Sequence, residues 1–127
     1  MPVLALPVDA GPGLLFETAR LDRSGRLFAC GLLRALRWPP GHQVEIDAIE
    51  GALVIGSAPG GRHTVGDRGD LALPAALRRL CGIVPGPPIL LVASVPEDRL
   101  VAHRASTVVR LLGELHALLV DGADDVG

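Results

Sequence analysis

The stretch that decides the fold is Gly-Asp-Leu-Ala-Leu-Pro-Ala-Ala-Leu-Arg-Arg-Leu-Cys-Gly-Ile, residues 69–83. The apolar residues before Pro74 predict a short strand. Pro74 suits the first turn of a helix, where its missing N–H is not needed. Leu77 and Leu80 are three positions apart and share one face of that helix, which we expect to face the core. The Pro-Gly pair at 85–86 ends the helical part.

The same order of residues occurs earlier in the chain, at a constant offset of 44. Residues 21–36 align with residues 65–80, with five identities in sixteen positions. The identical pairs are Gly25 and Gly69, Leu27 and Leu71, Leu33 and Leu77, Arg34 and Arg78, and Leu36 and Leu80. We therefore expect two tandem copies of one unit, residues 14–57 and 62–104, joined by the loop 58–61.

Each copy is expected to contain a turn, a short strand, a short helix and a β-hairpin, in that order. Asp and Gly at the turn positions are typical of type I turns, and apolar alternation such as Val44, Ile46 and Ala48 indicates a half-buried strand. The expected strands and helices are 27–29, 31–36, 44–48 and 52–56 in copy one, and 71–73, 74–80, 89–94 and 99–103 in copy two.

Length and composition exclude several classes of protein. The 127 residues suggest one domain, and 49% apolar residues with a net charge of −2 exclude a mainly disordered chain. Two cysteines are too few for a disulfide scaffold. The longest charge-free run, residues 80–96, is shorter than the roughly 20 residues that span a bilayer, and the N-terminus has no basic signal-peptide region. We therefore expect no membrane association and a cytoplasmic location.

The pattern changes after Arg104. Val108, Leu112, Leu115 and Leu119 are spaced by four, three and four residues, which is the spacing of a helical stripe that packs against a partner. This spacing predicts a C-terminal helix over 105–120, followed by an acidic tail at 121–127. The stripe packs on the body of the protein, pairs with a second copy to give a homodimer, or binds another protein. Residues 1–13 are expected to form a flexible arm.

The repeated unit resembles the AbrB/MazE/SpoVT DNA-binding family. Residues 69–83, followed by Pro-Gly and a hairpin, look like that family's unit, and residues 24–36 resemble it more loosely. The resemblance implies a mainly β fold in which two units exchange hairpins to form one eight-stranded barrel. Two units in one chain imply that this swapped-hairpin barrel forms as an intrachain pseudo-dimer, with the C-terminal helix added to it.

The resemblance also implies a bacterial transcription regulator that contacts DNA through arginines of the strand turn and the short helices. The matching positions are Arg26, Arg34, Arg78 and Arg79. Arginine suits this role because its fork binds phosphate or guanine in a bidentate manner. Between residues 18 and 104 there are 11 arginines and 8 acidic residues, so the middle of the chain is modestly basic. The alternative is that these are ordinary solvated surface arginines.

Two positions depart from the family pattern. Asp70 stands where the turn arginine of copy two is expected, and its anion is expected to repel phosphate. Ala35 replaces the second helix arginine of copy one. The DNA-binding surface is therefore expected to be asymmetric.

Other functions have less support in the residues. The four histidines and two cysteines lack the spacing of a metal site, and no motif of a catalytic nucleophile or phosphate-binding loop occurs. We therefore expect no metal, no cofactor and no enzyme activity. Two alternatives to DNA binding stay open: a MazE-like antitoxin that binds a toxin through residues 105–127, and an assembly module that does not bind DNA.

Overall fold

The computed structural model describes residues 8–9, 11 and 13–125, and it confirms a mainly β fold with a C-terminal helix. Repeat one contains β2 (Leu14–Ala19), β3 (Arg26–Phe28), α1 (Cys30–Ala35), β4 (Gln43–Ile49) and β5 (Ala52–Ser57). Repeat two contains β6 (His63–Thr64), β7 (Asp70–Ala72), α2 (Ala75–Cys81), β8 (Ile89–Ser94) and β9 (Arg99–Arg104). The two repeats are preceded by β1 (Val8–Asp9) and followed by α3 (Ala105–Asp125).

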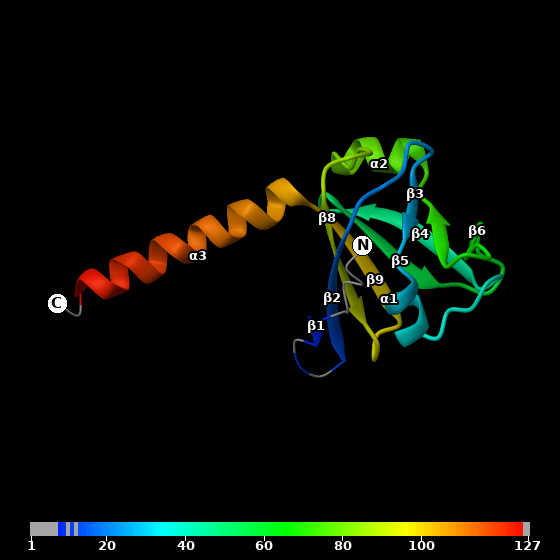
Figure 1. The fold of residues 1–127 in the computed structure, drawn as a ribbon, viewed down its shortest axis with the longest axis horizontal. Coiled ribbons are helices and arrows are strands. Elements are labelled where there is room, and N and C mark those ends of the chain that lie inside the picture. Colours follow the sequence, from blue (N-terminus) through cyan, green and yellow to red (C-terminus); the bar gives the residue numbers. More distant parts are fainter. Residues whose placement is uncertain (1–7, 10, 12, 126–127) are drawn as a thin grey trace, which may run out of the picture.

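The strands form two sheets, and neither sheet is closed (Figure 1). The larger sheet is antiparallel, with the strand order β1-β2-β8-β9-β5-β4-β6. The other sheet is a ribbon of β3 and β7 alone. The expected closed barrel therefore does not form as such, because the three-residue strands β3 and β7 pair with each other and do not join the edges of the large sheet.

The pairings run between the two repeats. Strand β2 of repeat one pairs with β8 of repeat two, and β6 of repeat two pairs with β4 of repeat one. In the ribbon, Leu27 lies opposite its own counterpart Leu71. Between β5 and β9, Val54 lies opposite Val101. The two repeats are therefore interleaved about an approximate twofold axis, and they are not separate domains.

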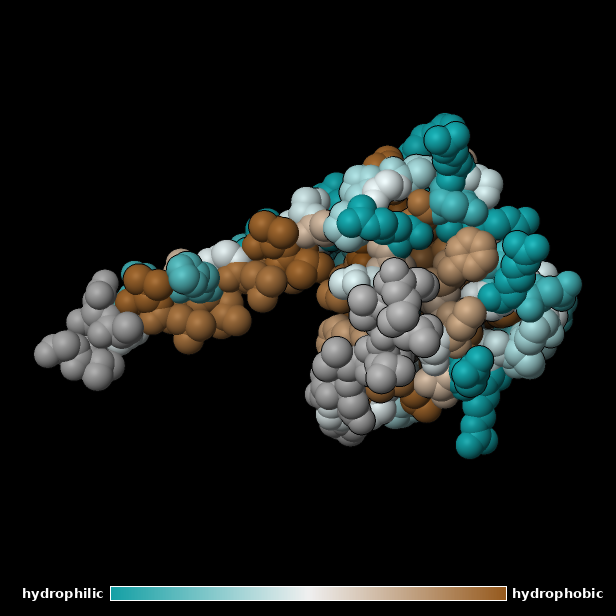
Figure 2. Space-filling model, viewed as in Figure 1, coloured by the Kyte–Doolittle hydropathy of each residue, from teal (hydrophilic) through white to brown (hydrophobic). Residues whose placement is uncertain are grey.

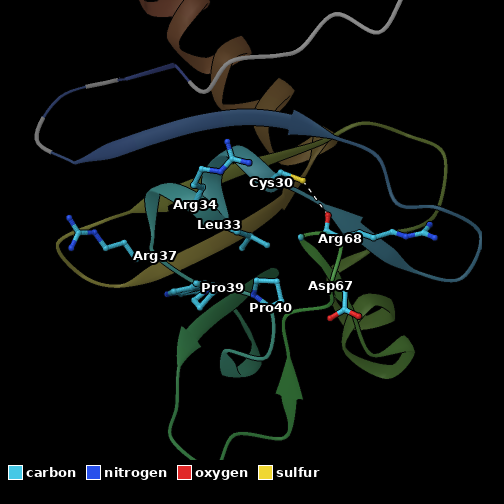
Figure 3. A pocket seen from close by; sticks show the side chains of 10 residues that line it. Cys30, Leu33, Arg34, Arg37, Pro39, Pro40, Asp67 and Arg68 are labelled. Atoms are coloured by element: carbon cyan, nitrogen blue, oxygen red, sulfur yellow. Dashed lines mark hydrogen bonds between the residues drawn. The ribbon is translucent and has the colours of Figure 1, made fainter.

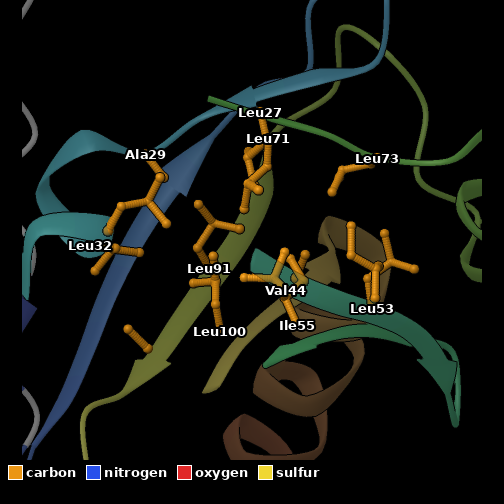
Figure 4. Packing of buried hydrophobic residues seen from close by; sticks show 14 of the residues in the cluster. Leu27, Ala29, Leu32, Val44, Leu53, Ile55, Leu71, Leu73, Leu91 and Leu100 are labelled. Atoms are coloured by element: carbon orange, nitrogen blue, oxygen red, sulfur yellow. The ribbon is translucent and has the colours of Figure 1, made fainter. Parts of the chain in front are cut away.

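The core lies between the large sheet and the layer made by the ribbon with α1 (Figure 4). Leu27 and Leu71 point from the ribbon toward the sheet and are almost fully buried. The sheet contributes the facing side chains Val44, Leu53, Ile55, Leu91 and Leu100, all buried. This core is built almost entirely from aliphatic residues.

The face of α2 that packs on the core is not the one expected from the sequence. Leu77 packs against the core, but Leu80 is 73% exposed, and Cys81 is buried in its place. The inward face is therefore defined by residues four apart, Leu77 and Cys81, and the prediction for Leu80 is wrong. In repeat one, the counterparts Leu33 and Leu36 are both buried, as expected.

The ends of the chain also differ from expectation. Residues 8–9 of the expected flexible arm form β1 and pair with β2, whereas residues 1–7, 10 and 12 lie outside the described part. Helix α3 does not end at residue 120. It continues through Gly122 to Asp125, so most of the expected acidic tail is helical. Among the described helices, none combines the length and the apolarity that crossing a bilayer requires.

Candidate nucleic-acid interface

The ribbon brings together the turns that precede its two strands. The turn of repeat one closes with a hydrogen bond from Gly25 N–H to the carbonyl of Asp22, and the turn of repeat two closes with one from Gly69 N–H to that of Gly66. Asp22, Ser24 and Arg26 share a shallow hollow with Asp67, Arg68 and Asp70 of the other repeat. The predicted turn arginine and its counterpart are therefore neighbours across the approximate twofold axis.

Arg26 and Asp70, which occupy equivalent positions in the two repeats, form an ion pair. Arg26 Nη1 lies 2.5 Å from Asp70 Oδ2, and the Asp70 side chain is only 7% exposed. Asp70 Oδ1 also accepts a hydrogen bond from the backbone N–H of Arg68. Asp70 is therefore buried, and its charge is balanced by Arg26, which removes the physical basis for expecting its anion to repel phosphate.

The carboxylate of Asp22 is used by its own turn. Its Oδ1 accepts hydrogen bonds from the backbone N–H of Arg26, from the hydroxyl of Ser24 and from the backbone N–H of Ser24. These bonds, first that to Arg26, hold the pKa of Asp22 below its usual range. Asp22 is therefore a structural anion that fixes the turn from which Arg26 projects.

Each short helix supports the turn of the other repeat. On α2, Arg78 Nε donates to the carbonyl of Leu73, and the guanidinium packs so closely on Gly25 that a Cβ there would lie 2.8 Å from Arg78 Cζ. On α1, Cys30 Sγ donates to the carbonyl of Arg68. Arg78 is therefore partly a structural residue, and its removal is expected to disturb the turn as well as any contact with DNA.

A hollow of about 540 Å³ lies beside α1 (Figure 3). Leu33, Trp38, Pro39 and Pro40 contribute its apolar wall. Figure 3 shows Arg34 and Arg37 on one side of it and Arg68 on the other. We call Arg34, Arg37 and Arg68 the arginine rim.

The arginine rim is free to bind an anion. All three residues are exposed, and within residues 13–125 their guanidinium groups make no hydrogen bond and no ion pair. A guanidinium keeps its charge at any physiological pH and presents five donors. Three such groups around one apolar hollow can bind phosphate oxygens while the wall accommodates a sugar or a base.

Arg37 has an unfavourable backbone conformation. Its φ is +61°, in the left-handed region, where it ends α1 by donating its N–H to the carbonyl of Arg34. At the matching end of α2, repeat two has Gly82, with a φ of +64°. Glycine is the usual residue there because it has no Cβ to clash. Repeat one thus holds an arginine in a position that favours glycine, and strain of this kind is common at functional sites.

We expect Arg37→Gly to raise stability while it weakens DNA binding. Removing the left-handed strain should stabilise the fold by about 1 kcal/mol, measured by urea denaturation. Removing one guanidinium from the rim should lower the affinity for a DNA duplex at low salt. Arg37→Ala is the matched control: it removes the same charge and keeps the strain, so it should weaken binding without the gain in stability. A variant that gains stability and binds as well as the parent would remove Arg37 from the interface.

The four arginines predicted from the sequence therefore have different environments. Arg34 belongs to the rim, Arg26 is paired with Asp70, Arg78 is half-buried against Gly25, and Arg79 is exposed on α2. Sequence reasoning missed Arg37 and Arg68, which lie outside the motif of the family. Comparison of the two copies could have identified Arg37, because it occupies the position at which copy two has Gly82. Among the described residues, no cluster of His, Cys, Asp or Glu could hold a metal ion.

Comparison with known proteins gives no relative: no family model, curated protein or solved structure matches this chain.

Proposed function

We propose that the protein binds DNA as a transcription regulator of the AbrB/SpoVT type, and that its two repeats form an intrachain pseudo-dimer of swapped hairpins. The observation that carries the proposal is the arginine rim. Its three guanidinium groups lie next to the ribbon, have no partner in the described chain and surround one hollow. Asp67 also lines the hollow, so three guanidinium groups are grouped there with one carboxylate, and the hollow keeps an excess of positive charge in a protein whose net charge is −2.

The strand register supports the pseudo-dimer. Ala19 lies opposite Ile89, and the equivalent residue His63 lies opposite Val44. The first strand of each repeat therefore pairs with the hairpin of the other repeat. An exchange of this kind is what two swapped units within one chain require. The large sheet is open at β1 and β6, so the proposed member of the family is a variant in which the barrel has opened.

The interface is expected to be one-sided. The residues that correspond to the rim in the other repeat are Arg78, Gly82 and Ser24. Of these, Arg78 donates a hydrogen bond to the carbonyl of Leu73 and packs on Gly25. One side of the pseudo-dimer therefore presents the three arginines of the rim, and the other presents Arg79 together with Arg23, the exposed counterpart of Asp67. A site without twofold symmetry in the DNA fits this surface better than a palindrome.

The test is a salt series on DNA binding with two matched double variants. Arg34→Ala with Arg68→Ala removes two guanidinium groups from the rim, and Arg62→Ala with Arg110→Ala removes two from elsewhere. We expect the rim variant to bind more weakly, with a log–log salt dependence that is flatter by about 0.9 for each phosphate that it no longer neutralises. The control variant should keep the slope of the parent. Equal slopes for the rim variant and the parent would exclude the rim as the DNA interface.

A fragment library of genomic DNA is the suitable probe, because the sequence of the target is not known. Binding is measured at two salt concentrations, so that electrostatic capture is separated from contacts to base edges. Absence of binding by the parent at low salt would favour the alternatives, an antitoxin or an assembly module.

A further inference from the structure

Helix α3 leaves the sheet at the end of β9 and projects away from the body of the protein (Figure 1). It has 21 residues, which corresponds to about 31 Å of helix. Every described side chain from residue 109 to residue 122 is exposed. Of the three alternatives for the stripe, packing on the body does not apply to this part of the helix.

The exposed apolar face is wider than the predicted stripe. Leu112, Leu115 and Leu119 are 59%, 50% and 64% exposed, and Leu111 and Leu118 are exposed beside them. Figure 2 shows the apolar residues as an almost continuous brown band along the projecting helix. When Leu112 and Leu119 are taken as heptad position a and Leu115 as d, the added leucines Leu111 and Leu118 occupy position g.

This width indicates more than one neighbouring helix. A seam of a and d residues alone is what a two-stranded coiled coil buries, whereas a, d and g together are typical of a helix in the core of a bundle. A pair of α3 helices would leave Leu111 and Leu118 in water. In addition, a helix with Gly113 and Gly122 gains little stability by itself, because helical stability in proteins comes mainly from packing.

The charges along α3 indicate the direction of packing. The helix has no acidic residue in its first turn and no basic residue in its last turn. Arg104 and Arg110 lie toward its N-terminal end, and Asp121, Asp124 and Asp125 lie toward its C-terminal end. Acidic residues at a C-terminus oppose the dipole of their own helix, but they are favourable beside the N-terminus of an antiparallel neighbour.

We propose that α3 assembles four copies of this chain into an antiparallel four-helix bundle. The partner of the apolar face is a second copy of the same helix, and the a, d and g leucines form the bundle core. The bodies then lie at the two ends of the bundle, with their arginine rims in solution. This assembly does not depend on DNA binding.

The oligomeric state is tested by sedimentation equilibrium with the full chain. A protomer has a mass of 13.2 kDa, and we expect the parent to sediment as four of them. Leu112→Asp with Leu115→Asp places two charges in the proposed core and should give the monomer. The matched control, Gly113→Asp with Ala117→Asp, places the same charges on the opposite side of the helix and should keep four chains. A parent that sediments as a monomer or a dimer, or a core variant that keeps four chains, would overturn the proposal.

The direction of packing is tested by disulfide cross-linking in a Cys30→Ser background. In an antiparallel pair centred between Leu112 and Leu115, Val108 of one chain lies opposite Leu119 of the next. A mixture of Val108→Cys and Leu119→Cys chains should therefore form a cross-linked heterodimer on mild oxidation, and neither chain alone should do so. Efficient cross-linking of the Leu119→Cys chain with itself would indicate parallel helices and overturn the antiparallel bundle.

Discussion

Replacing Asp70 with arginine is expected to destabilise the fold by about 3 kcal/mol and to leave DNA binding no stronger. The sequence alone favoured stronger DNA binding by this variant, because an arginine at this position would complete the family motif. The structure reverses that expectation through burial: the Asp70 side chain is 7% exposed, and it neutralises Arg26. Removing one partner of a buried ion pair leaves the other charge uncompensated, which commonly costs about 3–5 kcal/mol. Arg26 is half exposed, which places the expected cost at the lower end.

Space adds to the cost of Asp70→Arg. A Cβ built on Gly66 would come within van der Waals overlap of the Asp70 carboxylate, so the turn fits closely around the smaller side chain. An arginine cannot replace that carboxylate without displacing the turn. The hydrogen bond from the backbone N–H of Arg68 would lose its acceptor as well. The destabilisation is measured as a lower midpoint in urea.

The control is the charge swap, Arg26→Asp together with Asp70→Arg. The two positions are equivalent in the two repeats and lie on neighbouring strands, so the swap restores a pair of opposite charges across the same axis. We expect it to recover only the electrostatic part of the lost stability, because the arginine at position 70 still displaces the turn. The double-mutant cycle gives the coupling between the two side chains. If Asp70→Arg unfolded at the same urea concentration as the parent, the ion pair would contribute nothing.

The local elements were predictable because the same residue pattern occurs in both copies, so each copy supports the prediction made for the other. The second strand, the helix and the hairpin of each copy lie within one residue of their expected bounds, whereas no bounds were expected for the first strands, β2 and β6. The turn at Gly25 is supported by that at Gly69, and the helix at Leu33 by that at Leu77. Local propensity and apolar period decide these features, and both are properties of the chain itself.

Features that depend on a partner far along the chain could not be predicted in the same way. The pairing of Arg26 with Asp70 joins residues 44 positions apart, and the motif at each position gives no sign of it. Leu80 satisfies the same helical pattern as Leu36, but it is exposed because α2 uses Cys81 as its second inward residue. The apolar stripe of α3 fits packing on the body as well as packing on another chain, and only the direction in which the helix leaves β9 decides between them.

A large loss of stability from a single truncation is expected at the centre of the ribbon. Leu27 and Leu71 lie opposite each other between β3 and β7, and both are 1% exposed or less. Leu71→Ala removes a fully buried side chain and should cost about 3 kcal/mol. Leu80→Ala is the matched control in the same repeat. Because its side chain is 73% exposed, it should cost under about 0.5 kcal/mol.

The same variant tests whether the two repeats unfold together. Trp38 is the only tryptophan in the chain. It is buried in repeat one and donates a hydrogen bond from its ring N–H to Asp98 of repeat two, so its fluorescence reports the loss of that contact as well as the unfolding of repeat one. Leu71 belongs to repeat two. Because the strands of the repeats are interleaved, Leu71→Ala should shift the Trp38 transition and the far-UV circular dichroism transition by the same amount in urea. A Trp38 transition that stayed at its parental midpoint would mean that repeat one folds independently of the ribbon.

When Leu27→Ala is added to Leu71→Ala, we expect the loss of stability to be less than twice that of Leu71→Ala alone. The two side chains fill one shared space, so their truncations are not independent.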